Sequence, residues 1–255
     1  MARGLMVATS IALALGLVGS PSAAPHGPQA PAADVAGAIA DPGRPPADVA
    51  RDAERKPADM LVFAELKPGE VMAELLPGGG YFTRIFSKAV GPKGRIYAII
   101  TETQAKADKP PAVNAIAADP AYPNVKVVAA DFAKLQLPEP VDLVWTSQNY
   151  HDLHLARTNL DVAAVNRAIF QALKPGGLYV IVDHAAAAGT GLDVPDKLHR
   201  IDPAIVRREV EAAGFRYEGQ TTVLRNPADD HHLLVFDPAI RGHTDQFVYK
   251  FRKPK

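Results

Sequence analysis

Residues 71–83 read VMAELLPGGGYFT, and this stretch decides the fold that the sequence predicts. An apolar run ends in a proline and three glycines, and apolar residues then recur at helical spacing from Phe82 onward. This pattern is typical of a buried parallel strand that turns into its crossover helix. Glycine lets a ligand approach the backbone closely, and the first turn of the helix offers free N–H groups beside it. Because ligands bind at the carboxyl ends of strands in open α/β sheets, we expect the ligand site here.

The glycines do not follow the dinucleotide-binding pattern, because Thr83 stands where that pattern has its third glycine. They resemble motif I of the class I S-adenosylmethionine (SAM)-dependent methyltransferases, in which an acid is followed by alternating glycines. Here the motif stands as Glu74, Leu76, Gly78 and Gly80, so that a leucine replaces the first glycine. A glycine-rich turn that binds no ligand is the alternative interpretation.

Later segments resemble the same proteins in the same order. The segment LKPGG at residues 173–177 precedes an apolar strand, as in class I methyltransferases. More narrowly, PGGGYFT, TSQNYHD, LHRID and TDQF resemble a family of exported, predicted methyltransferases. The resemblance implies an α/β, Rossmann-like class I methyltransferase fold, with a seven-stranded, mostly parallel sheet and helices on both faces. We expect a C-terminal antiparallel hairpin formed by residues 231–236 and 245–252.

The resemblance also implies an activity and a donor site. The activity is methyl transfer from SAM to an acceptor, for which a small molecule is expected. Class I methyltransferases usually carry an acid at the end of the second strand that holds the ribose hydroxyls. Here Ile100 stands there, and Glu102 is the nearest acid. The predicted SAM-binding residues are Glu74, Pro77, Gly78, Gly79, Gly80, Tyr81, Glu102, Asp131, Phe132 and Ser147.

Asp131 and Phe132 follow the third strand of the predicted sheet. The resemblance implies that Asp131 accepts a hydrogen bond from the adenine amino group and that Phe132 lies along the ring. The alternative is that Asp131 caps the following turn, as aspartate often does at the end of a strand.

The segment after the fourth strand, SQNYHDLH at residues 147–154, carries the densest set of reactive side chains. The resemblance places the end of this strand beside the transferred methyl group. Methyl transfer requires positioning and a dry pocket, and a nitrogen or oxygen acceptor must also lose its proton. We therefore expect His151 with Asp152 to form the base, because the acid can fix the imidazole tautomer. Tyr150 or Asn149 is expected to orient the acceptor.

Two other roles for His151 stay open. It can cap the following helix, or bind a metal ion with His154, although two histidines three apart are weak evidence without a third ligand. Residues 229–232 (DDHH) resemble a metal cluster, but we expect them to be solvated turn residues. No metal is therefore expected. Further candidates for the acceptor pocket, with surface or structural roles as the alternative, are His184, His199 and Arg200.

The first 23 residues are expected to be a signal peptide. Arg3 precedes an apolar stretch over residues 5–18, and small residues then lead to Ala23, a pattern typical of a cleaved signal; an uncleaved anchor is the alternative. Residues 24–47 are rich in Pro, Ala and Gly and are expected to be a disordered linker. The methyltransferase-like domain is then expected over residues 48–255, in the periplasm or secreted, with no membrane span after cleavage.

The composition narrows the classes of partner. The 255 residues contain 28 Lys and Arg, 28 Asp and Glu, and no Cys. The balanced charge gives no basis for binding nucleic acid or an anionic membrane, and the lack of cysteine excludes disulfides and thiolate metal sites. SAM is made in the cytoplasm, so an exported methyltransferase lacks an obvious donor supply. The second hypothesis is therefore an exported, non-catalytic ligand-binding protein on the same fold.

Overall fold

The structure, a computed structural model, describes Met1 and residues 33–255. Apart from Met1, the predicted signal peptide lies outside the described residues, as does the first part of the predicted linker. Among the described residues, no helix is long and apolar enough to cross a membrane.

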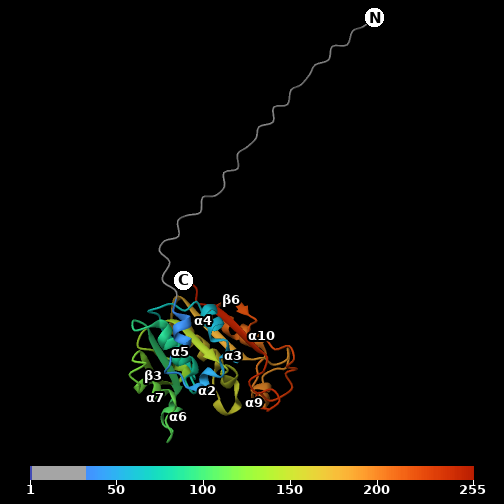
Figure 1. Ribbon diagram of the computed structural model, residues 1–255. Coiled ribbons are helices and arrows are strands. Elements are labelled where there is room, and N and C mark those ends of the chain that lie inside the picture. Colours follow the sequence, from blue (N-terminus) through green and yellow to red (C-terminus); the bar gives the residue numbers. More distant parts are fainter. Residues whose placement is uncertain (2–32) are drawn as a thin grey trace. The chain divides into compact units, whose positions relative to one another are not determined.

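A seven-stranded sheet with the order β3-β2-β1-β4-β5-β7-β6 lies at the centre of the fold (Figure 1). Strands β1 to β5 are parallel, and β7 is antiparallel to both β5 and β6. The chain order reverses between β1 and β4, which opens a crevice at their carboxyl ends. The predicted sheet is confirmed. The strands are β1 (Val71–Leu75), β2 (Arg95–Thr101), β3 (Val125–Ala130), β4 (Val141–Ser147), β5 (Leu173–His184), β6 (Arg216–Thr221) and β7 (Gln246–Arg252).

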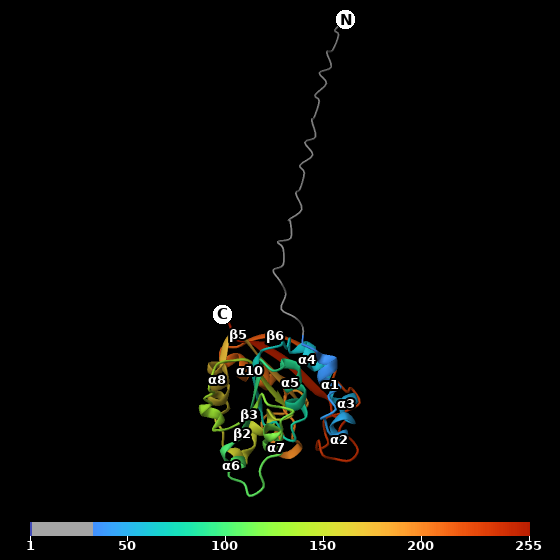
Figure 2. The same ribbon diagram turned by 60° about the vertical axis from the view of Figure 1, so that its left-hand side comes forward.

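Helices cover both faces of the sheet (Figure 2), because alternate strand residues point to opposite sides. Met72 of β1 packs in the cluster under α1, α4 and α5, whereas Ala73 and Leu75 pack in the cluster under α8 and α10. The α-helices are α1 (Val35–Ile39), α2 (Pro46–Val49), α3 (Asp52–Arg55), α4 (Pro57–Phe63), α5 (Tyr81–Val90), α6 (Glu102–Ala105), α7 (Val113–Ala118), α8 (Val162–Ala172), α9 (Val194–Leu198) and α10 (Pro203–Ala212). The 3-10 helices are η1 (Phe132–Lys134), η2 (His151–His154) and η3 (Ala156–Thr158).

Residues 33–47 belong to the folded domain, which corrects the prediction of a linker up to residue 47. Asp34 caps α1 by accepting a hydrogen bond from the backbone of Gly37, and Ala38 is buried where α1 packs against α5. Arg44, only 4% exposed, bonds to Asp52 of α3. The composition of this segment, rich in alanine and proline, is typical of a disordered linker. Its small side chains nevertheless allow α1 to pack closely against α5.

The C-terminal antiparallel pair is also different from the prediction. Strand β7 is the expected one, but its outer partner is β6 and not residues 231–236. His231 has a φ of 66°, and the carboxylates of Asp229 and Asp230 accept hydrogen bonds from the backbone of His231 and His232. These aspartate turns compete with strand hydrogen bonding, which explains why an apolar run there forms no strand.

Candidate functional site

A cavity of about 250 Å³ opens at the carboxyl ends of β1 and β4, the point where the strand order reverses. We call it the donor cavity. The turn after β1 and the residues that end β4 form one side, and helices α2 and α3 supply the remaining charged groups. The lining residues are Asp48, Arg51, Arg55, Glu74, Leu75, Leu76, Pro77, Gly78, Gly79, Tyr81, Phe82, Ser147, Gln148 and Asn149.

The three glycines after β1 have different roles. A Cβ atom at Gly78 or Gly79 would meet no heavy atom within 4 Å, so both present bare backbone to open space. At Gly80, where φ is 78°, a Cβ atom would lie 2.0 Å from Ile116 Cδ1 of α7. Gly80 is therefore required for packing, whereas Gly78 and Gly79 leave room for a ligand. Leu76, in place of the usual glycine, keeps a φ of 50°, a left-handed conformation that costs a leucine about 1–2 kcal/mol.

Glu74 is a buried acid at the inner end of the donor cavity. Its carboxylate accepts a hydrogen bond from Thr83 Oγ1 at 2.5 Å. Burial raises its pKa to about 8, against the opposing charge of Arg55. Thr83, which excluded the dinucleotide pattern, thus serves as the hydrogen-bond donor to the acid of the first strand.

Two arginines from the N-terminal helices border the same cavity, and the sequence analysis did not identify them. The Arg55 guanidinium lies 4.8 Å from the centroid of the Tyr81 ring and bonds to the side chain of Gln148. Burial lowers the pKa of Arg55 to about 10, and the nearby charge of Arg51 acts in the same direction. A pair of cations in a partly buried cavity is suited to bind an anionic group.

The residues predicted to contact adenine and ribose are not among those lining the donor cavity. Glu102 is exposed on α6 and faces Lys106. Asp131 caps η1 by accepting a hydrogen bond from the backbone of Ala133 at 3.0 Å, and Phe132 is buried in the core. Asp131 therefore adopts the capping role that the sequence left as an alternative, and the donor-contact roles of these residues stay predictions.

The segment after β4 separates into residues with different surroundings. Asn149 donates hydrogen bonds to the backbone oxygens of Leu76 and Ser147, and so joins the turns that follow β1 and β4. Tyr150 is fully buried: its hydroxyl donates to Glu209 and accepts from Asn166. Tyr150 is thus bonded within the core, whereas Asn149 lines the donor cavity.

His151 begins η2 and is almost completely buried beside a carboxylate that the sequence analysis did not pair with it. Its Nδ1 lies 2.8 Å from Oδ1 of Asp183, and its backbone N–H donates to Oδ2 of Asp183 at 2.7 Å. Its Nε2 lies 3.5 Å from Oδ1 of the predicted partner, Asp152. Burial lowers the pKa of His151, but the two carboxylates outweigh this effect and raise it. Asp183 is the second-last residue of β5, which pairs with β4, and this strand position was the only sequence signal for it.

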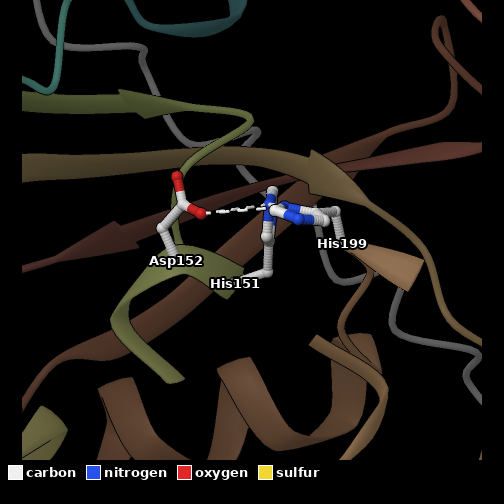
Figure 3. Close-up of side chains that lie close together, drawn as sticks. All are labelled: His151, Asp152 and His199. Carbon is white, nitrogen blue, oxygen red and sulfur yellow. Dashed lines mark hydrogen bonds and ion pairs between the residues drawn. The ribbon is translucent and has the colours of Figure 1, made fainter. Parts of the chain in front are cut away.

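The remaining histidines have distinct partners. His199 follows α9 and points toward His151 and Asp152, as Figure 3 shows. His154 lies 3.0 Å from Glu209, so it does not form the metal pair with His151 that the sequence left open. His184 contacts Thr244, and burial lowers the pKa of its imidazole to about 4.

Residues 229–232 match the expected solvated turn only at Asp230 and His232, which are exposed. Asp229 is buried and forms a bidentate ion pair with Arg200, which is itself fully buried. His231 bonds to Asp245 at 3.0 Å. This group stabilises the loops around residues 200, 229 and 245, and Arg200 has a structural role.

Residues 74–181 match the family model described as "Methyltransferase domain". This stretch is less than half of the chain, and it is similar to a methyltransferase domain. No curated protein matches the sequence. Among solved structures, a SAM-dependent methyltransferase from Aquifex aeolicus is 18% identical with a TM-score of 0.58, covering 84% of this chain and 96% of that one. Fibrillarin from Aeropyrum pernix, with natively bound SAM, is 17% identical with a TM-score of 0.50, covering 79% and 76%. The [4+2]-cyclase SpnF is 17% identical with a TM-score of 0.55, covering 82% and 81%. At these identities the structural similarity shows the fold, which is that of the class I methyltransferases.

The matched methyltransferase domain accounts for only part of the donor cavity. The domain supplies the turn after β1 and the end of β4, whereas Asp48, Arg51 and Arg55 precede residue 74. The family match supports the predicted methyltransferase enzyme with SAM as its donor and leaves the acceptor open. The residues that the N-terminal segment contributes to the cavity therefore lie outside the matched stretch.

Proposed function

We propose that the protein transfers a methyl group from SAM to a small-molecule acceptor and that the donor cavity holds SAM. The observation that carries this proposal is the bare backbone of Gly78 and Gly79 beside buried Glu74, within the matched domain. When bound, SAM supplies an electrophilic methyl group on a sulfonium. The residues present fit this ligand, because the glycines leave space for it and the cavity offers both acidic and basic groups.

The charged groups of the cavity suit the amino-acid end of SAM. Arg51 and Arg55 are placed to bind a carboxylate, for which an arginine fork provides directed, charge-assisted hydrogen bonds. Asp48 is the acid that would face its ammonium group, and buried Glu74 would accept a hydrogen bond from that group. SAM and S-adenosylhomocysteine share this end, whereas methylthioadenosine lacks both the carboxylate and the ammonium.

His151 is the proposed base on the acceptor side. A charged Asp183 holds the proton of the imidazole on Nδ1, so that Nε2 presents its lone pair toward Asp152 and His199. This corrects the predicted pair by adding the carboxylate that is in hydrogen-bond contact. Asn149, two residues earlier, is the proposed link between the acceptor and the donor cavity.

Calorimetric titration of the full chain with SAM, S-adenosylhomocysteine and methylthioadenosine tests the donor site. We expect micromolar binding of SAM and S-adenosylhomocysteine by the wild type. Gly79→Val fills the open space without a left-handed backbone and should abolish binding of all three. Arg55→Ala should weaken the first two about 10- to 100-fold, the effect of losing a charged hydrogen-bond pair, and leave methylthioadenosine nearly unchanged.

Arg208→Ala, at an exposed position on α10, is the matched control and should bind like the wild type. Thermal unfolding of each variant establishes that it is folded. If the folded wild type binds none of the three compounds, or if Gly79→Val binds them normally, the proposed donor site is wrong.

A specific observation favours a second function, that of an exported ligand-binding protein on the same fold. The ribose position holds Ile100, which is buried, and no acid from the end of β2 lines the donor cavity. The structural neighbours include a protein described as a cyclase, so this fold also occurs in proteins with other activities. Under this alternative, SAM does not bind and substitution of His151 leaves the binding of the true ligand intact.

A further inference from the structure

Three side chains from two separate segments converge beside the ends of β4 and β5. His151 and Asp152 begin η2, and His199 follows α9 (Figure 3). His151 Nε2 lies 3.3 Å from Nδ1 of His199 and 3.5 Å from Oδ1 of Asp152. His199 Nδ1 and the same oxygen of Asp152 are 3.9 Å apart.

These distances are those expected between ligands of one metal ion. A Zn²⁺ ion binds imidazole nitrogen and carboxylate oxygen at about 2.0–2.2 Å, so tetrahedral ligand atoms lie about 3.3–3.5 Å apart. Two of the three separations fall in this interval, and the third exceeds it by a few tenths of an ångström. The side chain of Asp152 is 31% exposed, so it has room to close this difference.

The hydrogen bonds around His151 leave its Nε2 lone pair free to bind a metal ion. Asp183 is fully buried, and its carboxylate holds the Nδ1 proton, which leaves the lone pair on Nε2. A metal-binding histidine commonly donates its other N–H to a carboxylate in this way. The backbone N–H groups of His151 and His184 also donate to Asp183, so the carboxylate is fixed by both η2 and β5.

The charges and the exposure of the cluster also suit a cation. Metal binding requires neutral imidazoles, and Asp152 and Asp183 would then contribute two negative charges, a sum that one divalent ion balances. The exposed Arg157 places a positive charge near all three side chains, which opposes a bound cation and which the two carboxylates outnumber. The side chain of His199 is 22% exposed, which leaves a fourth position open to solvent or to a ligand.

We propose that His151, Asp152 and His199 form a binding site for a divalent transition-metal ion of the zinc class. Two imidazoles and one carboxylate favour such an ion over Mg²⁺ or Ca²⁺, which prefer oxygen ligands. The open fourth position would take a water molecule or the heteroatom of a methyl acceptor and lower its pKa. This acceptor role rests on the proposed function and replaces His151 as the base, whereas ion binding itself requires no donor.

Metal binding is tested on the full chain without a histidine tag, after removal of bound metal with a chelator. Zn²⁺ affinity is measured by competition with a chromophoric chelator, and Co²⁺ by its visible absorption. We expect one ion per chain. His199→Ala and Asp152→Asn, both at partly exposed positions, should each weaken binding at least about tenfold, since even an outer partner of a metal site has that effect. They should also remove the Co²⁺ absorption.

His154→Gln is the matched control, because it changes a neighbouring histidine of η2 that is bonded to Glu209. It should bind zinc like the wild type. Absence of one-to-one binding by the folded wild type overturns the proposal, as does equal affinity in the His199 variant or an equal loss in the control. Titration of the metal-free samples with SAM separates the two proposals, since failure of either binding event leaves the other measurable.

Discussion

The carboxyl group of Glu74 gives the donor cavity a pH dependence. Its folded-state pKa is about 8, raised from 4.5 by burial. Between these values the folded protein binds more protons at this site than the unfolded chain. The contribution of Glu74 to stability is thus complete below pH 4.5 and is lost as the pH rises through about 8, by at most about 1.4 kcal/mol per unit.

Glu74→Gln should remove this part of the pH dependence. Glutamine stays neutral and still accepts a hydrogen bond from Thr83, so the variant should resemble the wild type near pH 5 and be more stable at pH 8. Denaturant unfolding at several pH values measures the difference between the two curves. Glu211→Gln, at an exposed position, is the control. Parallel curves for wild type and Glu74→Gln would show that Glu74 is charged in the folded protein at neutral pH.

At single positions, the sequence motifs predicted local geometry better than they predicted contacts between distant residues. The turn after β1 lies where motif I placed it, because spacing along one strand and turn fixes local geometry. The pairing of His151 with Asp183 was missed, because it depends on the register of β4 against β5. His199 was named only as a separate candidate, since no local pattern brings it to residues that lie almost fifty positions earlier.

A polar network around Asp52 helps to hold the N-terminal helices to the domain. Asp52 of α3 accepts hydrogen bonds from both terminal nitrogens of Arg44 and, at 2.6 Å, from the Tyr81 hydroxyl of α5. The Arg44 side chain is fully buried, whereas that of Asp52 is 24% exposed. Because Tyr81 also lines the donor cavity, this network places Arg51 and Arg55 beside it.

Replacing one partner of the Arg44–Asp52 pair should destabilise the protein more than replacing both partners with apolar residues. Asp52→Ala leaves a buried guanidinium unpaired and should cost about 2–4 kcal/mol, somewhat less than a fully buried pair because Asp52 is partly exposed. The double variant Arg44→Met, Asp52→Leu should lose less stability than the sum of the losses measured for Arg44→Met and Asp52→Leu singly. Denaturant unfolding measures these values, with Asp59→Ala on exposed α4 surface as control. Strictly additive losses would mean that the pair is not coupled.

Among the elements, those with strong apolar periodicity were predictable, and those stabilised by tertiary contacts were not. The parallel strands have near-continuous apolar runs, and β7 alternates its aromatic residues. In contrast, β6 reads RYEGQT and carries little apolar signal of its own. It forms because β7 presents an edge to pair with, an effect that no local pattern records. Helix α1 depends in the same way on the face of α5.

At the scale of the whole molecule, we propose that the protein is exported, and its N-terminal residues provide the test. Leu13→Arg interrupts the apolar stretch over residues 5–18 and should keep the chain uncleaved in the cytoplasm. The wild type should be recovered outside the cytoplasmic membrane of a bacterial host and start near Ala24. Cell fractionation with intact-mass measurement checks both, and Arg208→Ala should behave like the wild type. A wild type retained in the cytoplasm with its first residues intact would contradict export.

The outcome of that experiment also bears on the donor. If the protein stays in the cytoplasm, where SAM is made, the enzyme needs no other source of SAM. An exported protein must either receive SAM after export or carry it across while folded, and a Sec-type route that moves unfolded chains excludes the second. If export is found together with tight SAM binding, a source of SAM outside the cytoplasm is required. If export is found without SAM binding, the binding-protein function becomes the better account of Gly78, Gly79 and Arg55, with an anionic ligand other than SAM.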